Sequence, residues 1–259
     1  MTFDKKEFFG EFIGTAILVF FGCGSVASAI LFGSFEGLFQ IAMVWTIGVS
    51  IAIYASRSYS GAHLNPAVSI AMVITKNLPS NKLPLYIGAQ FLGAFFAAGV
   101  LYALFSEQIE FFEAQMGIVR GSANSIVSGS MFGEYFPNPG FADRFGEVEV
   151  PQAMLVEGLG TFILVYAIYW VTKTDKLHNI APVLIGATVG ALICLLAPVT
   201  QGGFNPARDF GPRLFAYFAG WGDAAFPSAT FSFFTVYILA PIIGGAAAAF
   251  AHRTFHRAG

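Results

Sequence analysis

Two copies of the triplet Asn-Pro-Ala are the residues whose types and spacing point most directly to a function. They are Asn65, Pro66 and Ala67 in the first half of the chain, and Asn205, Pro206 and Ala207 in the second half. Asn is a favoured N-cap and Pro is favoured at the first helical position, so each triplet predicts the abrupt start of a helix. The side-chain amide of each asparagine can also donate a hydrogen bond to a passing oxygen atom.

Four charged residues accompany the triplets or lie within apolar segments. Arg208 and Asp209 directly follow the second triplet, and Glu11 and Glu157 lie inside long apolar segments. An arginine stays charged and presents a planar fork of donors that matches two neighbouring hydroxyl groups. Buried charges almost always have partners, so we expect Glu11 and Glu157 to accept hydrogen bonds from the loop backbones beside the triplets. We expect Asp209 to brace its own loop in the same way.

The elements that must position these residues follow from an apolar composition. The chain has 259 residues, of which 56% are hydrophobic and 11% are charged, against about 25% charged in soluble domains. A soluble protein could not hide so much apolar surface, so we predict an integral membrane protein. A bilayer core needs about 20 apolar residues per helix, and six segments reach that length. They are Phe8–Phe32, Leu38–Ser56, Leu83–Phe105, Pro151–Val171, Ile180–Val199 and Phe231–Ala251.

Two further apolar segments begin at the triplets and are too short to span a bilayer. They are Asn65–Ile74 and Asn205–Phe218. Half-length helices are tolerated at membrane depth only where they line a cavity or pack against protein. The sequence therefore predicts an all-α membrane protein, with six transmembrane helices and two re-entrant half-helices beside a pore or a transport site.

The two halves of the chain repeat each other. Residues 11–19 return as residues 157–165, and residues 61–67 return as residues 201–207. Each half carries three spans, so the second copy must insert upside down, and the two triplets should meet in the middle of the membrane. The predicted parts of this one transmembrane channel domain, residues 1–259, are inverted repeat 1 at about 6–105, an extracellular connecting loop at about 106–150 and inverted repeat 2 at about 151–253.

The distribution of charge predicts the orientation. Lys and Arg collect on the side that holds both termini, whereas acidic residues are numerous on the other side. The positive-inside rule then places both termini in the cytoplasm, and the chain is expected to be a multi-pass protein of the cell membrane.

The paired triplets resemble the signature of the aquaporin family, also called the major intrinsic proteins. The Glu-x-x-Gly-Thr sequences that begin at Glu11 and Glu157 are part of the resemblance, which covers essentially the whole chain. The resemblance implies the aquaporin fold with two inverted repeats, and a passive channel that excludes protons and ions. It also implies a homotetramer in which each monomer holds its own pore.

Two further features are similar to the glycerol facilitators of that family. Arg213 follows four residues after Asp209, and the pair Pro241 and Ile242 lies in the sixth span. These features imply a channel for glycerol and other small uncharged solutes as well as water. They leave open which of glycerol, urea, ammonia and uncharged metalloid hydroxides pass.

Family spacing implies a narrow selectivity ring of four residues. These are Trp45, Ile193, Gly202 and Arg208. Trp45 and Arg208 fit a glycerol facilitator, whereas Ile193 and Gly202 make the ring resemble that of plant nodulin-26-like channels. Arg208 would donate to the hydroxyl groups of a solute, and Trp45 and Ile193 would face its carbon edge. Gly202 would widen the ring and leave backbone carbonyls within reach.

The non-helical stretches before the triplets are expected to present carbonyl acceptors to the solute. They contain Gly61, Ala62 and His63 in the first half, and Gly202, Gly203 and Phe204 in the second. The N-termini of both half-helices carry partial positive charge toward the same point. This charge should repel cations and orient a central water molecule so that it cannot relay protons.

Three other functions compete with a glycerol channel. A water-selective aquaporin would ordinarily have a histidine in place of Ile193. An ion-coupled secondary transporter also uses inverted repeats and broken helices, but the sequence offers no unpaired acidic pair in the pathway. A membrane enzyme is disfavoured because no catalytic or metal-binding arrangement lies within the spans. We therefore expect no catalytic residue, no cofactor, no metal and no nucleic-acid partner, and only small uncharged solutes and the lipid bilayer as partners.

Overall fold

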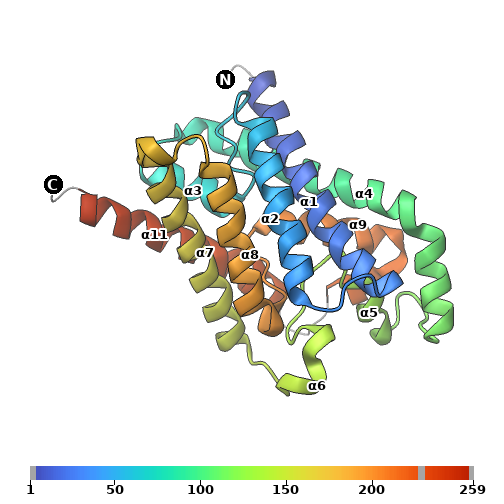
Figure 1. Cartoon of the computed structure of the whole chain (residues 1–259). Coiled ribbons are helices and arrows are strands. Elements are labelled where there is room, and N and C mark those ends of the chain that lie inside the picture. Colours follow the sequence, from blue (N-terminus) through green and yellow to red (C-terminus); the bar gives the residue numbers. More distant parts are fainter. Residues whose placement is uncertain (1–3, 227–230, 257–259) are drawn as a thin grey trace.

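The computed structural model describes residues 4–226 and 231–256, and these residues fold as a bundle of helices (Figure 1). Six helical spans within the described residues are long and apolar enough to cross a membrane. They are α1 (Lys5–Phe32), α2 (Leu38–Ser56), α4 (Leu83–Gln115), α7 (Val150–Lys173), α8 (Ala181–Thr200) and a last span that joins α10 (Ser232–Phe234), η7 (Thr235–Leu239) and α11 (Ala240–His256). The predicted all-α architecture with six spans is confirmed.

Local sequence signals set the ends of the first span. The Asp4 carboxylate accepts hydrogen bonds from the backbone N–H groups of Lys6 (3.1 Å) and Glu7 (3.2 Å), which would otherwise have no partner in the first turn. The helix ends at Gly33, whose φ of 59° is left-handed and suits glycine.

The spans pack as two sets of three helices. In one set α1 packs against α2 and α4, and in the other α7 packs against α8 and α11. Contact between α2 and α8 joins the two sets, and Figure 1 shows these helices side by side. A Cβ atom at Gly93 of α4 would overlap the backbone carbonyl of Phe12, and one at Gly244 of α11 would overlap the carbonyl of Gly158. Glycine is therefore required at both crossings, because only glycine lets the two backbones come so close.

The two half-helices are α3 (Pro66–Ile74) and α9 (Pro206–Ala216). Asn65 and Asn205 are their N-caps, and a proline occupies the first turn of each helix, as the triplets predict. α3 packs against α11 and α9 packs against α4, so each half-helix is covered by a full-length span. The second half-helix ends at Ala216, earlier than predicted, because the chain enters a π-helical turn, η5 (Tyr217–Trp221), and is kinked at Gly220.

The segment between the two halves is more ordered than a simple loop. α4 continues to Gln115, past the predicted end of the third span at Phe105, because residues 106–115 are rich in helix-forming Glu and Gln. Short helices then follow: η2 (Ala123–Ser125), α5 (Ile126–Gly129), η3 (Pro139–Phe141) and α6 (Ala142–Phe145). The last span also differs from prediction, since it begins at Ser232 and contains the π-helical segment η7.

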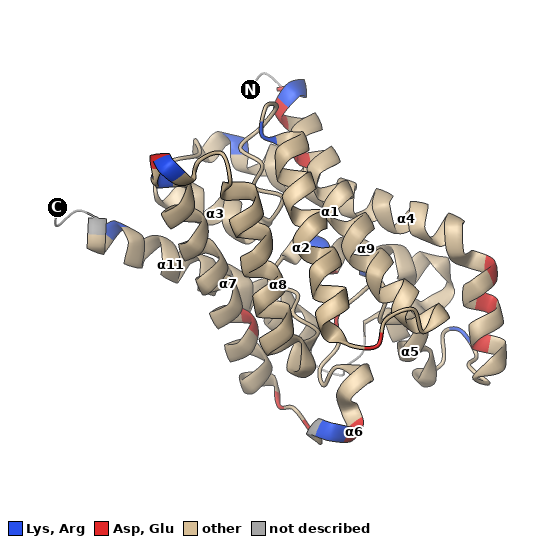
Figure 2. Ribbon diagram, in the orientation of Figure 1, with Lys and Arg blue, Asp and Glu red and all other residues tan. Residues whose placement is uncertain are grey.

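Figure 2 shows most charged residues at the ends of the helices and in the segments that connect them. The exceptions lie inside the bundle. Glu11, Glu157, Asp209 and Arg213 are at most 1% exposed, and Arg208 is 4% exposed. Each of these buried groups needs hydrogen-bond or ion-pair partners, and several of those partners belong to the candidate site.

Candidate functional site

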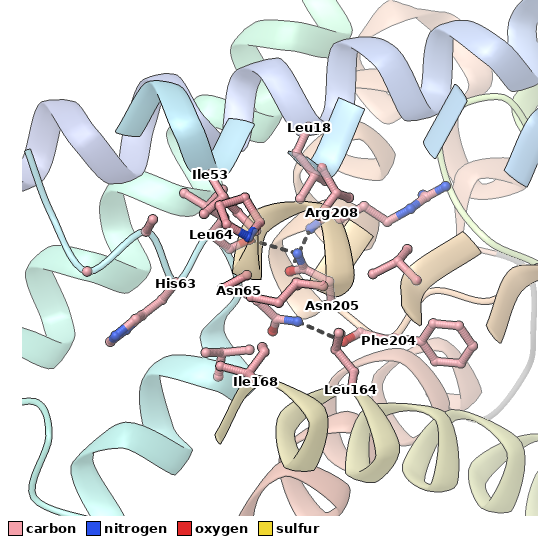
Figure 3. Close-up of a pocket in the computed structure, with 18 of the residues that line it drawn as sticks. Leu18, Ile53, His63, Leu64, Asn65, Leu164, Ile168, Phe204, Asn205 and Arg208 are labelled. Atoms are coloured by element: carbon pink, nitrogen blue, oxygen red, sulfur yellow. Dashed lines mark hydrogen bonds between the residues drawn. The ribbon is translucent and has the colours of Figure 1, made fainter. Parts of the chain in front are cut away.

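The N-termini of α3 and α9 meet inside the bundle and are tied together by their capping asparagines. The Asn65 Nδ2 atom donates to the carbonyl of Phe204 (2.9 Å), and the Asn205 Nδ2 atom donates to the carbonyl of Leu64 (2.7 Å), as Figure 3 shows. The side-chain oxygen of each asparagine caps its own helix, for example by accepting from the N–H of Ala67 at 2.8 Å. Each amide has two hydrogens, so one donor on each asparagine is left for a ligand.

The loops that lead into the half-helices have an unusual backbone. Ala62 and Leu64 have φ values of 48° and 54°, and Gln201 and Phe204 have values of 62° and 52°. The left-handed conformation costs non-glycine residues roughly 1–2 kcal/mol each, so both loops need external support.

Glu11 supports the first loop. Its carboxylate accepts hydrogen bonds from the backbone N–H groups of His63 (3.0 Å) and Leu64 (2.8 Å) and from the side chains of Ser60 (2.7 Å) and Gln90 (2.7 Å). These four donors fill the acceptor sites of an ionised carboxylate.

Glu157 supports the second loop in the same way. Its carboxylate accepts from the N–H groups of Gly203 (3.0 Å) and Phe204 (2.7 Å) and from the hydroxyl of Thr200 (2.6 Å). Neither Glu11 nor Glu157 is among the residues that line the cavity between the loops. Both glutamates thus brace the loops from behind.

A cavity of about 360 Å³, here called the central cavity, runs past both loops. The central cavity is lined by all the residues that are expected to present carbonyl acceptors or to form the ring: Gly61, Ala62, His63, Gly202, Gly203, Phe204, Trp45, Ile193 and Arg208. Asn65 and Asn205 line it as well. The structure therefore brings both halves of the predicted site to one cavity.

A second cavity of about 320 Å³, here called the loop-side cavity, is lined partly by residues of the connecting segment, among them Glu134 and Asn138. The two cavities share three lining residues, Trp45, Ile193 and Arg208. These three residues therefore lie at the junction where the two cavities adjoin.

The guanidinium group of Arg208 is placed to bind a polar solute at this passage. Its Cζ atom lies 4.5 Å from the centre of the Trp45 ring, within range of a cation–π interaction. Its Nε and Nη1 atoms are buried and have no hydrogen-bond partner within the part of the chain that the structure describes. Two donors thus point away from protein acceptors, beside the apolar side chains of Trp45 and Ile193.

Comparison with protein families matches residues 1–252 to the major intrinsic proteins. The chain belongs to this family. It is 43% identical over 247 residues to the glycerol uptake facilitator protein of Pseudomonas aeruginosa, covering 94% of this chain and 86% of that protein. It is 38% identical over 253 residues to the glycerol uptake facilitator protein of Escherichia coli K12, covering 96% and 87%.

Two other relatives extend the comparison. A propanediol uptake facilitator of Salmonella typhimurium is 39% identical over 257 residues, covering 97% of this chain and 94% of the relative. The X-ray structure of the aquaglyceroporin from Plasmodium falciparum superposes with a TM-score of 0.77 at 27% identity, covering 95% of this chain and 94% of that one. The predicted membership of the family and of its glycerol-facilitator branch is confirmed, and the likeness of the ring to nodulin-26-like channels stays a prediction.

In this major intrinsic protein, Gly202 has a backbone role in addition to the one predicted for it. Its φ of 79° is left-handed, and a Cβ atom there would lie 3.1 Å from the Phe204 ring and 3.5 Å from the Cβ of Ala197. A side chain at this position would therefore strain the loop as well as change the width of the passage.

Asp209 has partners that sequence reasoning did not identify. Its carboxylate accepts from the backbone N–H of Glu134 (2.8 Å) and from the Nε (3.0 Å) and Nη2 (2.6 Å) atoms of Arg213. We expected Asp209 to brace its own loop, but it holds the connecting segment and the next turn of α9 instead. The i,i+4 spacing of Asp209 and Arg213 is a local signal for their ion pair, but no local pattern signals the contact with Glu134.

Trp45 owes its position to a glycine on α1. A Cβ atom at Gly22 would overlap the Trp45 ring, which is only 5% exposed. We predict that Gly22→Ala pushes the ring toward the central cavity and lowers glycerol permeability more than water permeability, since glycerol is the larger solute. Stopped-flow measurements of both rates check this, with Gly88→Ala as the control, because a Cβ there meets nothing within 4 Å. Equal losses of both rates would contradict the predicted role of Trp45.

Proposed function

We propose that this protein is a passive channel for glycerol and other small uncharged solutes, with water, and that solutes cross between the two half-helices. One observation carries the proposal: two unpaired guanidinium donors of Arg208 stand beside the apolar Trp45 and Ile193 at the junction of two cavities. A polyol has hydroxyl groups on one edge and carbon atoms on the other. Arg208 can therefore bind the hydroxyl edge while Trp45 and Ile193 contact the carbon edge. The names of the relatives, glycerol and propanediol uptake facilitators, support the same solute class.

The channel replaces the hydration shell of the solute in steps. Arg208 donates to hydroxyl oxygens through its Nε and Nη1 atoms, while the carbonyls of the two loops accept from hydroxyl hydrogens. At the centre, the second hydrogen of the Asn65 and Asn205 amides donates to the passing oxygen. Each of these contacts involves only one or two donors or acceptors, so the solute exchanges from one to the next without tight binding.

Protons and cations are excluded at the centre of the pathway. The N-termini of α3 and α9 meet there, and both direct partial positive charge to one point. The hydrogen bonds from Asn65 to the carbonyl of Phe204 and from Asn205 to the carbonyl of Leu64 support this meeting. A water molecule that accepts from both asparagines cannot accept a further proton from its neighbours. The chain of water molecules is therefore interrupted for proton transfer.

The proposal also covers the inverted repeats, the orientation in the membrane and the oligomeric state. The two inverted repeats at about 6–105 and 151–253 are supported by the matching roles of Glu11 and Glu157, one in each half. The excess of Lys and Arg beside the termini supports a cell-membrane protein with both termini in the cytoplasm, and membership of the family supports a homotetramer.

An ion-coupled transporter is the alternative to test, because Glu11 and Glu157 are acidic residues within spans. Their carboxylates are occupied by backbone and side-chain donors, which supports a structural role. We predict that uptake of labelled glycerol into proteoliposomes rises linearly with glycerol concentration. We also predict that proton or sodium gradients, with or without an ionophore, do not change it. Saturating uptake that a gradient accelerates would contradict the channel and favour the transporter.

A further inference from the structure

The connecting segment places a buried carboxylate, that of Glu134, at the junction of the two cavities. Glu134 lies between α5 and η3 and is only 1% exposed. It lines the loop-side cavity together with Trp45, Ile193 and Arg208. No residue of the connecting segment had been predicted to reach the selectivity ring.

The backbone around Glu134 is held from two sides. Its N–H donates to the Asp209 carboxylate (2.8 Å), and its carbonyl accepts from the Nη2 atom of Arg213. The N–H of the next residue, Tyr135, donates to the side-chain oxygen of Gln201 (2.8 Å). These bonds fix the backbone of Glu134 and do not involve its carboxylate. The carboxylate is therefore available for a contact of its own.

The Glu134 side chain forms an ion pair with Arg208 through the Nη2 atom of the guanidinium. No other described residue donates a hydrogen bond to this carboxylate. The contact uses one end of the guanidinium fork and leaves Nε and Nη1 without protein partners. Glu134 thus determines which donors of Arg208 remain for a solute, and it neutralises the buried charge.

We propose that Glu134 is a fifth member of the selectivity ring, a positioning residue that holds Arg208 in its conducting orientation, and that protonation of its carboxyl group from the loop side lowers glycerol permeation. This inference rests on the proposed glycerol channel. Without the ion pair, the guanidinium keeps an uncompensated buried charge beside an open cavity and reorients into the passage. It then obstructs a polyol more than a water molecule.

The surroundings of Glu134 put its protonation within reach of ordinary pH. Burial raises the pKa of Glu134 to about 7, although Arg208 and Arg213 oppose the rise; the Asp209 carboxylate adds to it. The other ionisable groups that face this cluster are Glu157 of α7, Cys23 of α1, Tyr135 of the connecting segment and Tyr237 of η7. The ion pair is present above this pKa and is lost as the pH falls through it. The neutral fraction rises from about a tenth at about pH 8 to about nine-tenths at about pH 6.

The test compares glycerol and water permeability of proteoliposomes between about pH 8 and about pH 6. We expect the glycerol permeability of the unaltered channel to fall severalfold over this range, with a smaller change for water. Glu134→Gln should have low glycerol permeability at both values and no pH dependence. Glu36→Gln is the matched control, because Glu36 lines the same cavity but is exposed, and the ion pair of Arg208 is with Glu134.

A second variant tests whether a histidine of the pathway causes the pH dependence instead of Glu134. His178 is exposed and lines the central cavity, and His178→Asn should keep the pH dependence of the unaltered channel. The inference is overturned if the unaltered channel shows a flat pH profile. It is also overturned if His178→Asn abolishes the pH dependence, or if a folded Glu134→Gln keeps it. Glycerol permeation at about pH 8 tests the proposed channel separately, so the two proposals can fail independently.

Discussion

Ile193→His is expected to lower the ratio of glycerol to water permeability by at least about tenfold. Ile193 is 4% exposed and stands with Trp45 and Arg208 at the junction of the two cavities. An imidazole replaces the apolar surface that faces the carbon edge of glycerol with a group that binds water. The loss of one methylene group of apolar complementarity in such a pocket is worth about 1–3 kcal/mol, or roughly 10–200-fold in rate.

The ratio is measured by stopped-flow light scattering on the same proteoliposomes, so that differences in the amount of protein cancel. Ile193→Leu is the matched control, because it keeps the volume and the apolar character, and it should leave the ratio within about twofold of the unaltered channel. An unchanged ratio in Ile193→His would show that Ile193 does not belong to the selectivity ring.

Glu157→Gln is expected to lower both glycerol and water permeability by about tenfold or more. The carboxylate accepts three hydrogen bonds, from Thr200, Gly203 and Phe204, and an amide group can replace only part of them. Each buried donor left without an acceptor costs about 1–3 kcal/mol. The loop already carries strain at Phe204, whose φ is 52°, so we expect it to leave its conducting shape.

The measurement is stopped-flow permeability together with thermal unfolding, which should show a lower midpoint for Glu157→Gln. Glu110→Gln on the exposed surface of α4 makes the same change of side chain and should change neither quantity. If Glu157→Gln retained its water permeability, then the support of the second loop would have to come from other residues.

The spans and half-helices could be predicted because their signals are local. The apolar lengths that end at Phe32 and Ser56 match α1 and α2, and the proline and asparagine of each triplet mark the first turn of α3 and α9. The end of a helix cannot be predicted where the helix continues beyond its apolar residues. α4 continues to Gln115 through a polar stretch, because helix propensity and the bonds of Glu113 to Arg120 (2.9 Å) and Ser128 (2.7 Å) stabilise it.

The site could be predicted as far as the internal repeat and the family resemblance reach. The positions of Glu11 and Glu157 repeat, and the structure shows the two carboxylates in matching contacts with the two loops. Glu134 has no counterpart in the other half, and its segment has neither a motif nor a periodic pattern. Its contact with Arg208 depends on how the connecting segment folds over the bundle, which no local signal in the sequence specifies.

The central claim is that glycerol crosses the membrane through this chain, and stopped-flow light scattering on proteoliposomes tests it most directly. Water efflux under a sucrose gradient is compared with re-swelling under a glycerol gradient, and empty liposomes give the background. We expect glycerol re-swelling that is fast, well above the background and not saturable. Fast water efflux without glycerol entry would contradict it, and would mean that Ile193 closes the passage to glycerol and that the protein is a water channel.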